Sequence, residues 1–131
     1  MNLKSAILLW LIILVGSCTL PRQPLLTLKE KEVLSNLELK CHCQVERSYT
    51  SSYLRYRQKG DYIISFKRVP QKYQSYIADS GYIIARYIYN ELLKNDTNIA
   101  FVRYQIIDSM GNNTFKNTYY EYKTDSLLNI K

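Results

Sequence analysis

The sequence predicts an α+β protein with a single antiparallel sheet of about five strands, one main helix covering it, and a short N-terminal helix. Several segments alternate apolar and polar residues, which is typical of strands with one buried face. Residues 80–94 instead carry apolar residues at helical spacing. Short turn sequences between segments favour antiparallel pairing, and a sheet with one apolar face needs a helix to cover it.

The N-terminal helix and the first strand are predicted from two adjoining patterns. Thr27 and Glu30 form a capping box at the start of a helix that extends to about residue 36 and depends on tertiary packing. The next residues, 37–46, have the clearest alternation in the chain and predict a long strand. Its expected buried row is Leu37, Leu39, Cys41, Cys43 and Val45.

The next two strands are predicted to form a hairpin. Residues 53–58 and 61–69 flank Lys59-Gly60, a tight turn in which the glycine would supply a positive φ. Pro70 ends the second strand because it cannot donate a ladder hydrogen bond.

The second half of the chain predicts a helix followed by a strand pair. Asp79 or Ser80 is a good N-cap for a helix that runs to about residue 94, and Asn95 can close it in the left-handed conformation. An additional helical turn over residues 71–78 stays open. Residues 98–108 and 114–123 are then predicted to be strands joined by a turn, and the last eight residues a tail.

The first eighteen residues have the features of an export signal. Lys4 precedes an uncharged apolar run over residues 6–15, which is too short to span a bilayer comfortably. The run ends in Val15-Gly16-Ser17-Cys18, which resembles the lipobox of bacterial membrane lipoproteins. An ordinary cleaved secretory signal and an uncleaved anchor are the alternatives.

The lipobox resemblance implies cleavage between Ser17 and Cys18, with a diacylglycerol on the Cys18 thiol and, in many lipoproteins, an acyl chain on its new amine. It divides the chain into a signal peptide (1–17), a lipidated tether (18–27) and one α+β domain (28–131). Two or three acyl chains anchor a protein stably where one does not. Thr19, rather than aspartate, follows the cysteine. In lipoprotein sorting this favours the outer membrane, facing the periplasm of a bacterial cell envelope.

The charge balance agrees with such an address. The formal net charge is +7, or +6 after Lys4 leaves with the signal, so the domain is attracted to anionic head groups. Nucleic acid is the usual alternative partner for a basic protein, but an exported location argues against it. No glycine-rich phosphate loop or metal-ligand cluster occurs, and we expect no cofactor or metal.

Cys41-His42-Cys43 is the first candidate for chemistry. On the predicted strand both thiols point one way and His42 the other, so the three residues cannot hold one metal ion. The Cα atoms of Cys41 and Cys43 would be about 6.5–7 Å apart, at the upper limit for a disulfide. We interpret the cysteines as small buried side chains. One alternative is a strained or intermolecular disulfide, since an exported compartment can oxidise free thiols. Another is a soft-metal site, or a small exported hydrolase or thiol redox enzyme that uses His42 or these cysteines.

A basic stripe is the second candidate. The region 47–72 is rich in arginine, lysine and tyrosine, and on the predicted strand 53–58 the side chains of Tyr53, Arg55 and Arg57 share a face. Together with Lys67 they form a predicted protein-binding stripe, since tyrosine and arginine are favoured interface residues. A solvated face that protects the sheet is the alternative. The predicted function is a non-catalytic binding, assembly or toxin-neutralising (immunity-like) module with an envelope or exported protein partner.

Overall fold

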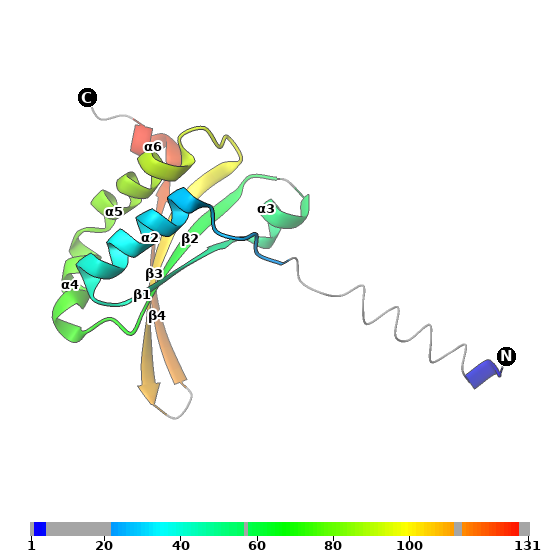
Figure 1. The fold of residues 1–131 in the computed structure, drawn as a ribbon, viewed down its shortest axis with the longest axis horizontal. Coiled ribbons are helices and arrows are strands. Elements are labelled where there is room, and N and C mark those ends of the chain that lie inside the picture. Colours follow the sequence, from blue (N-terminus) through cyan, green and yellow to red (C-terminus); the bar gives the residue numbers. More distant parts are fainter. Residues whose placement is uncertain (1, 5–21, 57, 112–113, 129–131) are drawn as a thin grey trace.

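The computed structural model describes residues 2–4, 22–56, 58–111 and 114–128, and its main body is an α+β domain with one sheet (Figure 1). The described residues form four strands in the order β1-β2-β3-β4. The strands are β1 (Gln44–Tyr49), β2 (Gly60–Lys67), β3 (Ile99–Gly111) and β4 (Thr114–Lys123). The predicted α+β class with a single sheet is confirmed.

The sheet is mixed rather than antiparallel. β1 pairs with β2 and β3 pairs with β4 in antiparallel fashion, but β2 and β3 run parallel. Parallel neighbours need a crossover connection, and the helical segment between β2 and β3 supplies it. The all-antiparallel prediction was wrong because it treated the two strand groups as separate hairpins and did not consider that the helix joins two adjacent strands.

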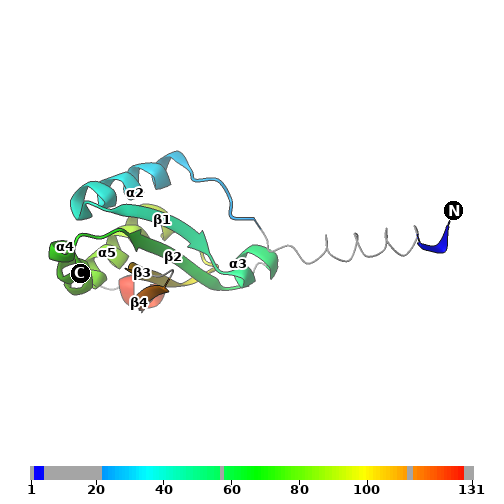
Figure 2. The same ribbon diagram turned by 90° about the horizontal axis from the view of Figure 1, so that it is seen from below.

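The helices of the domain are α2 (Leu28–Cys41), α3 (Ser51–Tyr56), α4 (Gln71–Asp79), α5 (Gly81–Ile88) with the π-helical turn η1 (Tyr89–Leu93), and α6 (Thr124–Leu128). α2, α4 and α5 lie along one side of the strands, α3 lies where β1 ends and β2 begins, and the β3–β4 hairpin extends beyond the helices (Figures 1 and 2).

The core fills the space between this helical layer and the inward face of the sheet. Tyr62, Ile64 and Phe66 of β2 are buried there, beside Val102 and Tyr104 of β3. The strand registers place Ile64 opposite Tyr104, so one apolar face continues across the sheet. The alternation predicted for these two strands is therefore confirmed.

α2 is longer than the sequence predicted. The capping box of Thr27 and Glu30 is present, but the helix continues to Cys41, so most of the predicted strand 37–46 is helical. Val33, Leu37 and Cys41 recur every four residues and are all buried, which is a helical spacing that coincides with the alternating pattern. Leu39, which the strand would have buried, is exposed.

The predicted strand 53–58 is wrong, because the chain forms α3 there. Packing favours the helical turn: the Tyr53 ring stacks on Tyr49 at 4.6 Å between centroids, and the Tyr53 hydroxyl donates to Asp96 Oδ2 at 2.8 Å. Gly60 does not supply a positive φ. It is needed for space, since a Cβ would lie 2.4 Å from the Thr50 hydroxyl oxygen.

The predicted main helix is two helices joined at Ser80. α4 adds the segment that the sequence left open, and Ser80 stands at the N-cap of α5 without a side-chain hydrogen bond. The Tyr104 hydroxyl donates to the carbonyl oxygens of Ile77 and Ala78 near the end of α4, which fixes the corner. Asn95 is not left-handed, so that prediction was wrong; the helix ends through η1 and the right-handed Lys94.

Candidate functional site

The predicted lipid-attachment residue Cys18 and its cleavage neighbour Ser17 lie outside the described residues. Within the described ranges, no helix is long and apolar enough to cross a membrane. The lipobox prediction therefore stays a prediction.

The described part of the predicted tether packs against the domain. Residues 22–27 run from beside α3 to the start of α2 (Figure 1). The Gln23 side chain makes two hydrogen bonds with the Tyr49 backbone: its amide nitrogen donates to the carbonyl oxygen at 3.1 Å, and its amide oxygen accepts from the backbone N–H at 2.8 Å. Arg47 Nη2 donates to the carbonyl of Pro24 at 2.8 Å. The chain is thus fixed to β1 from residue 23 onward.

A buried polar network lies where this segment meets α2 and β1. Arg47 Nε is 2.9 Å from Glu30 Oε2, and the two side chains are only 1% and 8% exposed. The Tyr62 hydroxyl donates to the same carboxylate oxygen at 2.7 Å, and burial raises the pKa of this phenol. Arg47 Nη1 is buried without a hydrogen-bond partner in the described residues, and the guanidinium packs 4.8 Å from the centroid of the Tyr49 ring. Such a network is costly to leave half-paired, which marks it as structural.

The structure does not bring the predicted basic stripe together. Tyr53 is half-buried and hydrogen-bonded to Asp96, and burial followed by that hydrogen bond raises its pKa to about 12. Arg55 lies on α3, and Arg57 is outside the described residues. Lys67 is at the opposite end of β2 from α3, about 20 Å away at the usual strand rise. It forms an ion pair with Glu46 at 2.6 Å.

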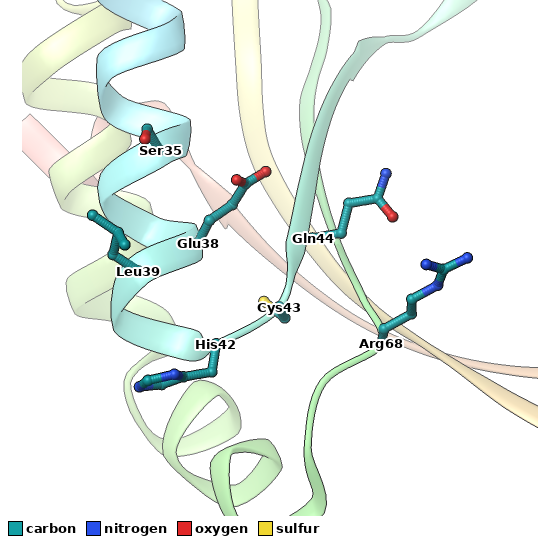
Figure 3. A pocket seen from close by; sticks show the side chains of 7 residues that line it. All are labelled: Ser35, Glu38, Leu39, His42, Cys43, Gln44 and Arg68. Atoms are coloured by element: carbon teal, nitrogen blue, oxygen red, sulfur yellow. The ribbon is translucent and has the colours of Figure 1, made fainter.

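Cys41-His42-Cys43 is a turn and not part of a strand. Cys41 ends α2, and His42 follows with left-handed angles of φ 50° and ψ 44°. The His42 ring stacks on Tyr73 with centroids 4.7 Å apart. Figure 3 shows His42 pointing away from Cys43. His42 therefore does not act as a base toward this thiol in the arrangement seen here.

Cys43 lines an open pocket of about 510 Å³ between the end of α2 and the end of β2. Glu38, Gln44 and Arg68 also line it (Figure 3). Glu38 is already used, since its carboxylate accepts the backbone N–H of Val45 at 3.1 Å. In the part of the chain that is described, no three His, Cys, Asp or Glu side chains are placed to hold a metal ion.

The sheet face opposite the helices, here called the open face, carries ladders of polar side chains. Arg103 of β3 contacts Asp61 of β2 at 2.8 Å and Glu121 of β4 at 2.7 Å. Gln105 donates to Ser65 at 2.8 Å and accepts from Asn117 at 3.0 Å. Burial raises the pKa of Asp61, and the nearby Arg103 opposes this shift. These side chains tie three strands together without a covering helix.

The open face also exposes aromatic side chains where the β3–β4 hairpin leaves the body. Phe115 is 67% exposed and Tyr119 is 62% exposed, and the Arg103 guanidinium lies 5.5 Å from the centroid of the Tyr119 ring. An open groove of about 570 Å³ runs beside Phe115 and is also lined by Lys67 and Ile107.

Sequence reasoning missed this surface because it followed the buried residues of each strand. The signal was the other half of the alternation: Arg103 and Gln105 on one strand face Glu121 and Tyr119 on the next.

No protein family, curated protein or solved structure matches this chain. Its function therefore has to be inferred from its own residues.

Proposed function

We propose that the protein is a small, lipid-anchored, non-catalytic binding module of the bacterial cell envelope. Its partner would be an exported or envelope protein that docks on the open face beside the β3–β4 hairpin. This role includes assembly of an envelope complex or neutralisation of a toxin. The location follows the lipobox resemblance, which places the anchor on Cys18 and favours the periplasmic face of the outer membrane.

The position of Gln23 supports the anchoring part of the proposal. Its hydrogen bonds to Tyr49 fix the chain at the α3 end of β1. Only residues 19–22 separate it from Cys18, and a fully extended chain covers about 3.3–3.6 Å per residue. An acylated Cys18 would thus hold the α3 end within about 18 Å of the bilayer surface. The hairpin extends from the body in a different direction (Figure 1).

The exposed aromatic residues carry the binding part of the proposal. Tyr119 and the neighbouring Arg103 are of residue types that often dominate interface energies, and Phe115 is of a type enriched at interfaces. Phe115 lines a groove, and the ion pair of Arg103 with Glu121 supplies the kind of polar rim that interfaces have. Monomeric proteins rarely gain stability from exposed aromatic side chains, so a partner is the better explanation of this patch.

The anchor is tested by the intact mass of the protein extracted from membranes, beside a Cys18→Ser variant. The expected mass is that of residues 18–131 plus diacylglycerol, with or without an N-acyl chain, and the variant should lose the lipid. An unacylated chain, or one that keeps Met1, would contradict the lipoprotein proposal.

The binding surface is tested in cells with a photo-crosslinking amino acid at position 119 and, as a matched control, at position 76. Tyr76 is also an exposed tyrosine, but it lies on α4. Position 119 should give a discrete adduct that Phe115→Ser abolishes, with no such adduct from position 76. Equal adducts from both positions, or none from position 119, would exclude the open face as the docking surface.

A further inference from the structure

The turn at His42 brings Cys41 and Cys43 closer than a strand would. A residue with helical angles, right- or left-handed, holds its two neighbouring Cα atoms about 5.4 Å apart, as the rise and radius of a helix require. His42 has such angles, with φ 50° and ψ 44°. Disulfides form when Cα atoms are about 4.4–6.8 Å apart. The geometric objection that applies to an extended Cys-His-Cys segment therefore does not apply here.

The two thiols also influence each other. The neighbouring Cys43 thiol lowers the pKa of Cys41. The neighbouring Cys41 thiol, followed by burial, raises the pKa of Cys43. Neither sulfur is committed to a disulfide in the structure. Of the two thiols, Cys41 is therefore the more easily deprotonated, which suits it to resolve a mixed disulfide, whereas Cys43 has to give up its proton to solvent before it can attack.

The two cysteines differ in access. Cys41 is buried in the core, whereas Cys43 is half-buried and lines the open pocket in Figure 3. A disulfide-bearing molecule can therefore reach Cys43 but not Cys41. This is the division between an attacking thiol and a resolving thiol in thiol–disulfide exchange.

We propose that Cys41 and Cys43 form a thiol–disulfide exchange site that accepts an external disulfide, R–S–S–R. Cys43 first loses its proton to solvent, and its thiolate then attacks one sulfur, which forms a mixed disulfide and releases R–S⁻ that takes up a proton as the first R–SH. The Cys41 thiolate then attacks the Cys43 sulfur, which forms the Cys41–Cys43 bond and releases the second R–SH. Two protein thiols are oxidised, and the external disulfide is reduced to two thiols. The site shares no residue with the lipid anchor or with the open face, so the exchange is independent of both.

The ring that closes contains only His42 between the cysteines, so the bond constrains little of the unfolded chain. A bond with so little entropic gain is readily reduced by a dithiol, and the exchange is reversible. The turn already has the required shape, so oxidation needs no refolding of α2 or β1.

The experiment uses the full chain carrying Cys18→Ser, so that only the two cysteines of the turn are counted. The reduced protein is incubated with oxidised glutathione, quenched with N-ethylmaleimide and weighed by mass spectrometry. We expect a product that has lost two hydrogen atoms, with neither glutathione nor maleimide attached, and its recovery as a dithiol after dithiothreitol. A stable product with two glutathiones, or two maleimides after prolonged oxidation, would overturn the proposal.

Single variants test the assigned roles. Cys41→Ser should accumulate one glutathione on Cys43, because the resolving thiol is missing. Cys43→Ser should stay unmodified, because Cys41 is buried. Far-ultraviolet circular dichroism checks that each variant is folded. Equal labelling of the two folded variants would refute the division between attacking and resolving thiol.

Discussion

On the covered face of the sheet, Arg47 and Glu30 pair with 1% and 8% of their side chains exposed, whereas on the open face Lys67 and Glu46 pair at 37% and 47%. Both pairs link neighbouring elements through one carboxylate, but only the first is shielded from water. When a shielded pair loses one partner, the remaining charge is buried and uncompensated. When a solvated pair loses one partner, water hydrates the remaining charge. The stability that depends on this shielded ion pair therefore belongs to the covered face, and the open face is the one on which we propose that a partner docks.

The largest expected effect separates the two ion pairs. Arg47→Met should lower the free energy of unfolding by about 3–5 kcal/mol, because Glu30 is left buried without its cation. The matched change Lys67→Met should cost about 0–1 kcal/mol. Urea denaturation of the two variants measures both. Equal losses would mean that the faces do not differ in the way described.

A smaller effect is expected at the corner between α4 and α5. A Cβ on Gly81 would lie 2.2 Å from the Tyr104 hydroxyl oxygen and 2.7 Å from that of Tyr122. Glycine to alanine in a helix usually stabilises by about 0.5–1 kcal/mol, but overpacking of this kind costs about 1–3 kcal/mol.

Gly81→Ala should therefore destabilise the protein, and the same substitution should cost less in a Tyr104→Phe chain, which has lost the nearest atom and, in both members of that comparison, the hydrogen bonds to Ile77 and Ala78. Thermal unfolding of the single and double variants gives the sign. A stabilised Gly81→Ala protein would show that the tyrosine cluster yields without cost.

The smallest effect is a pH dependence that belongs to the covered face. Burial, and then the hydrogen bond to Glu30, raises the pKa of Tyr62 above the usual 10.0. Above pH 10 the unfolded chain releases this proton and the folded chain keeps it, so stability that is full below pH 10 falls as the pH rises. Each tyrosine protected in this way contributes about 1.4 kcal/mol per pH unit.

Urea unfolding between pH 8 and about pH 11 measures how steeply the free energy of unfolding falls with pH. Tyr62→Phe should make this fall shallower by the contribution of one tyrosine, about 1.4 kcal/mol per pH unit. The variant also loses the hydrogen bond to Glu30, so its stability at pH 8 is lower while its slope is shallower. An unchanged slope would contradict the assignment to Tyr62.

The sequence predicted correctly those segments whose buried residues fit only one kind of secondary structure. The alternation of Tyr62, Ile64 and Phe66, and of Val102, Tyr104 and Ile106, fits a strand and nothing else, and the capping box of α2 is local. The sequence predicted too early an end for α2, because Leu37 and Cys41 satisfy both a period of two and a helical spacing of four. Only packing on β1 and η1 decides between them.

The site was harder to predict because it depends on contacts between distant segments. α3 forms where Tyr53 meets Asp96, a residue of the loop between η1 and β3, and no local pattern encodes this hydrogen bond. The strand that was predicted to carry the basic stripe is wrong, and Arg57 lies outside the described residues, so binding by the stripe stays a prediction. The open face was present in the sequence as the polar half of two strands, but its aromatic and arginine residues become one surface only after β3 and β4 pair.

Parallel pairing of β2 with β3 joins residues that are far apart in the chain, with Gly60 opposite Ile99. The β3–β4 hairpin, in contrast, closes between Gly111 and Thr114. Loop closure costs more for the distant pair, so the hairpin should form on a microsecond timescale and wait for the crossover to bring β2 alongside. Mutations at Tyr62 that weaken the pairing of β2 with β3 should then mainly speed unfolding, whereas mutations in the hairpin should slow folding. Until β2 pairs with β3, the apolar side of the hairpin is uncovered, and during this interval the chain is most prone to aggregate.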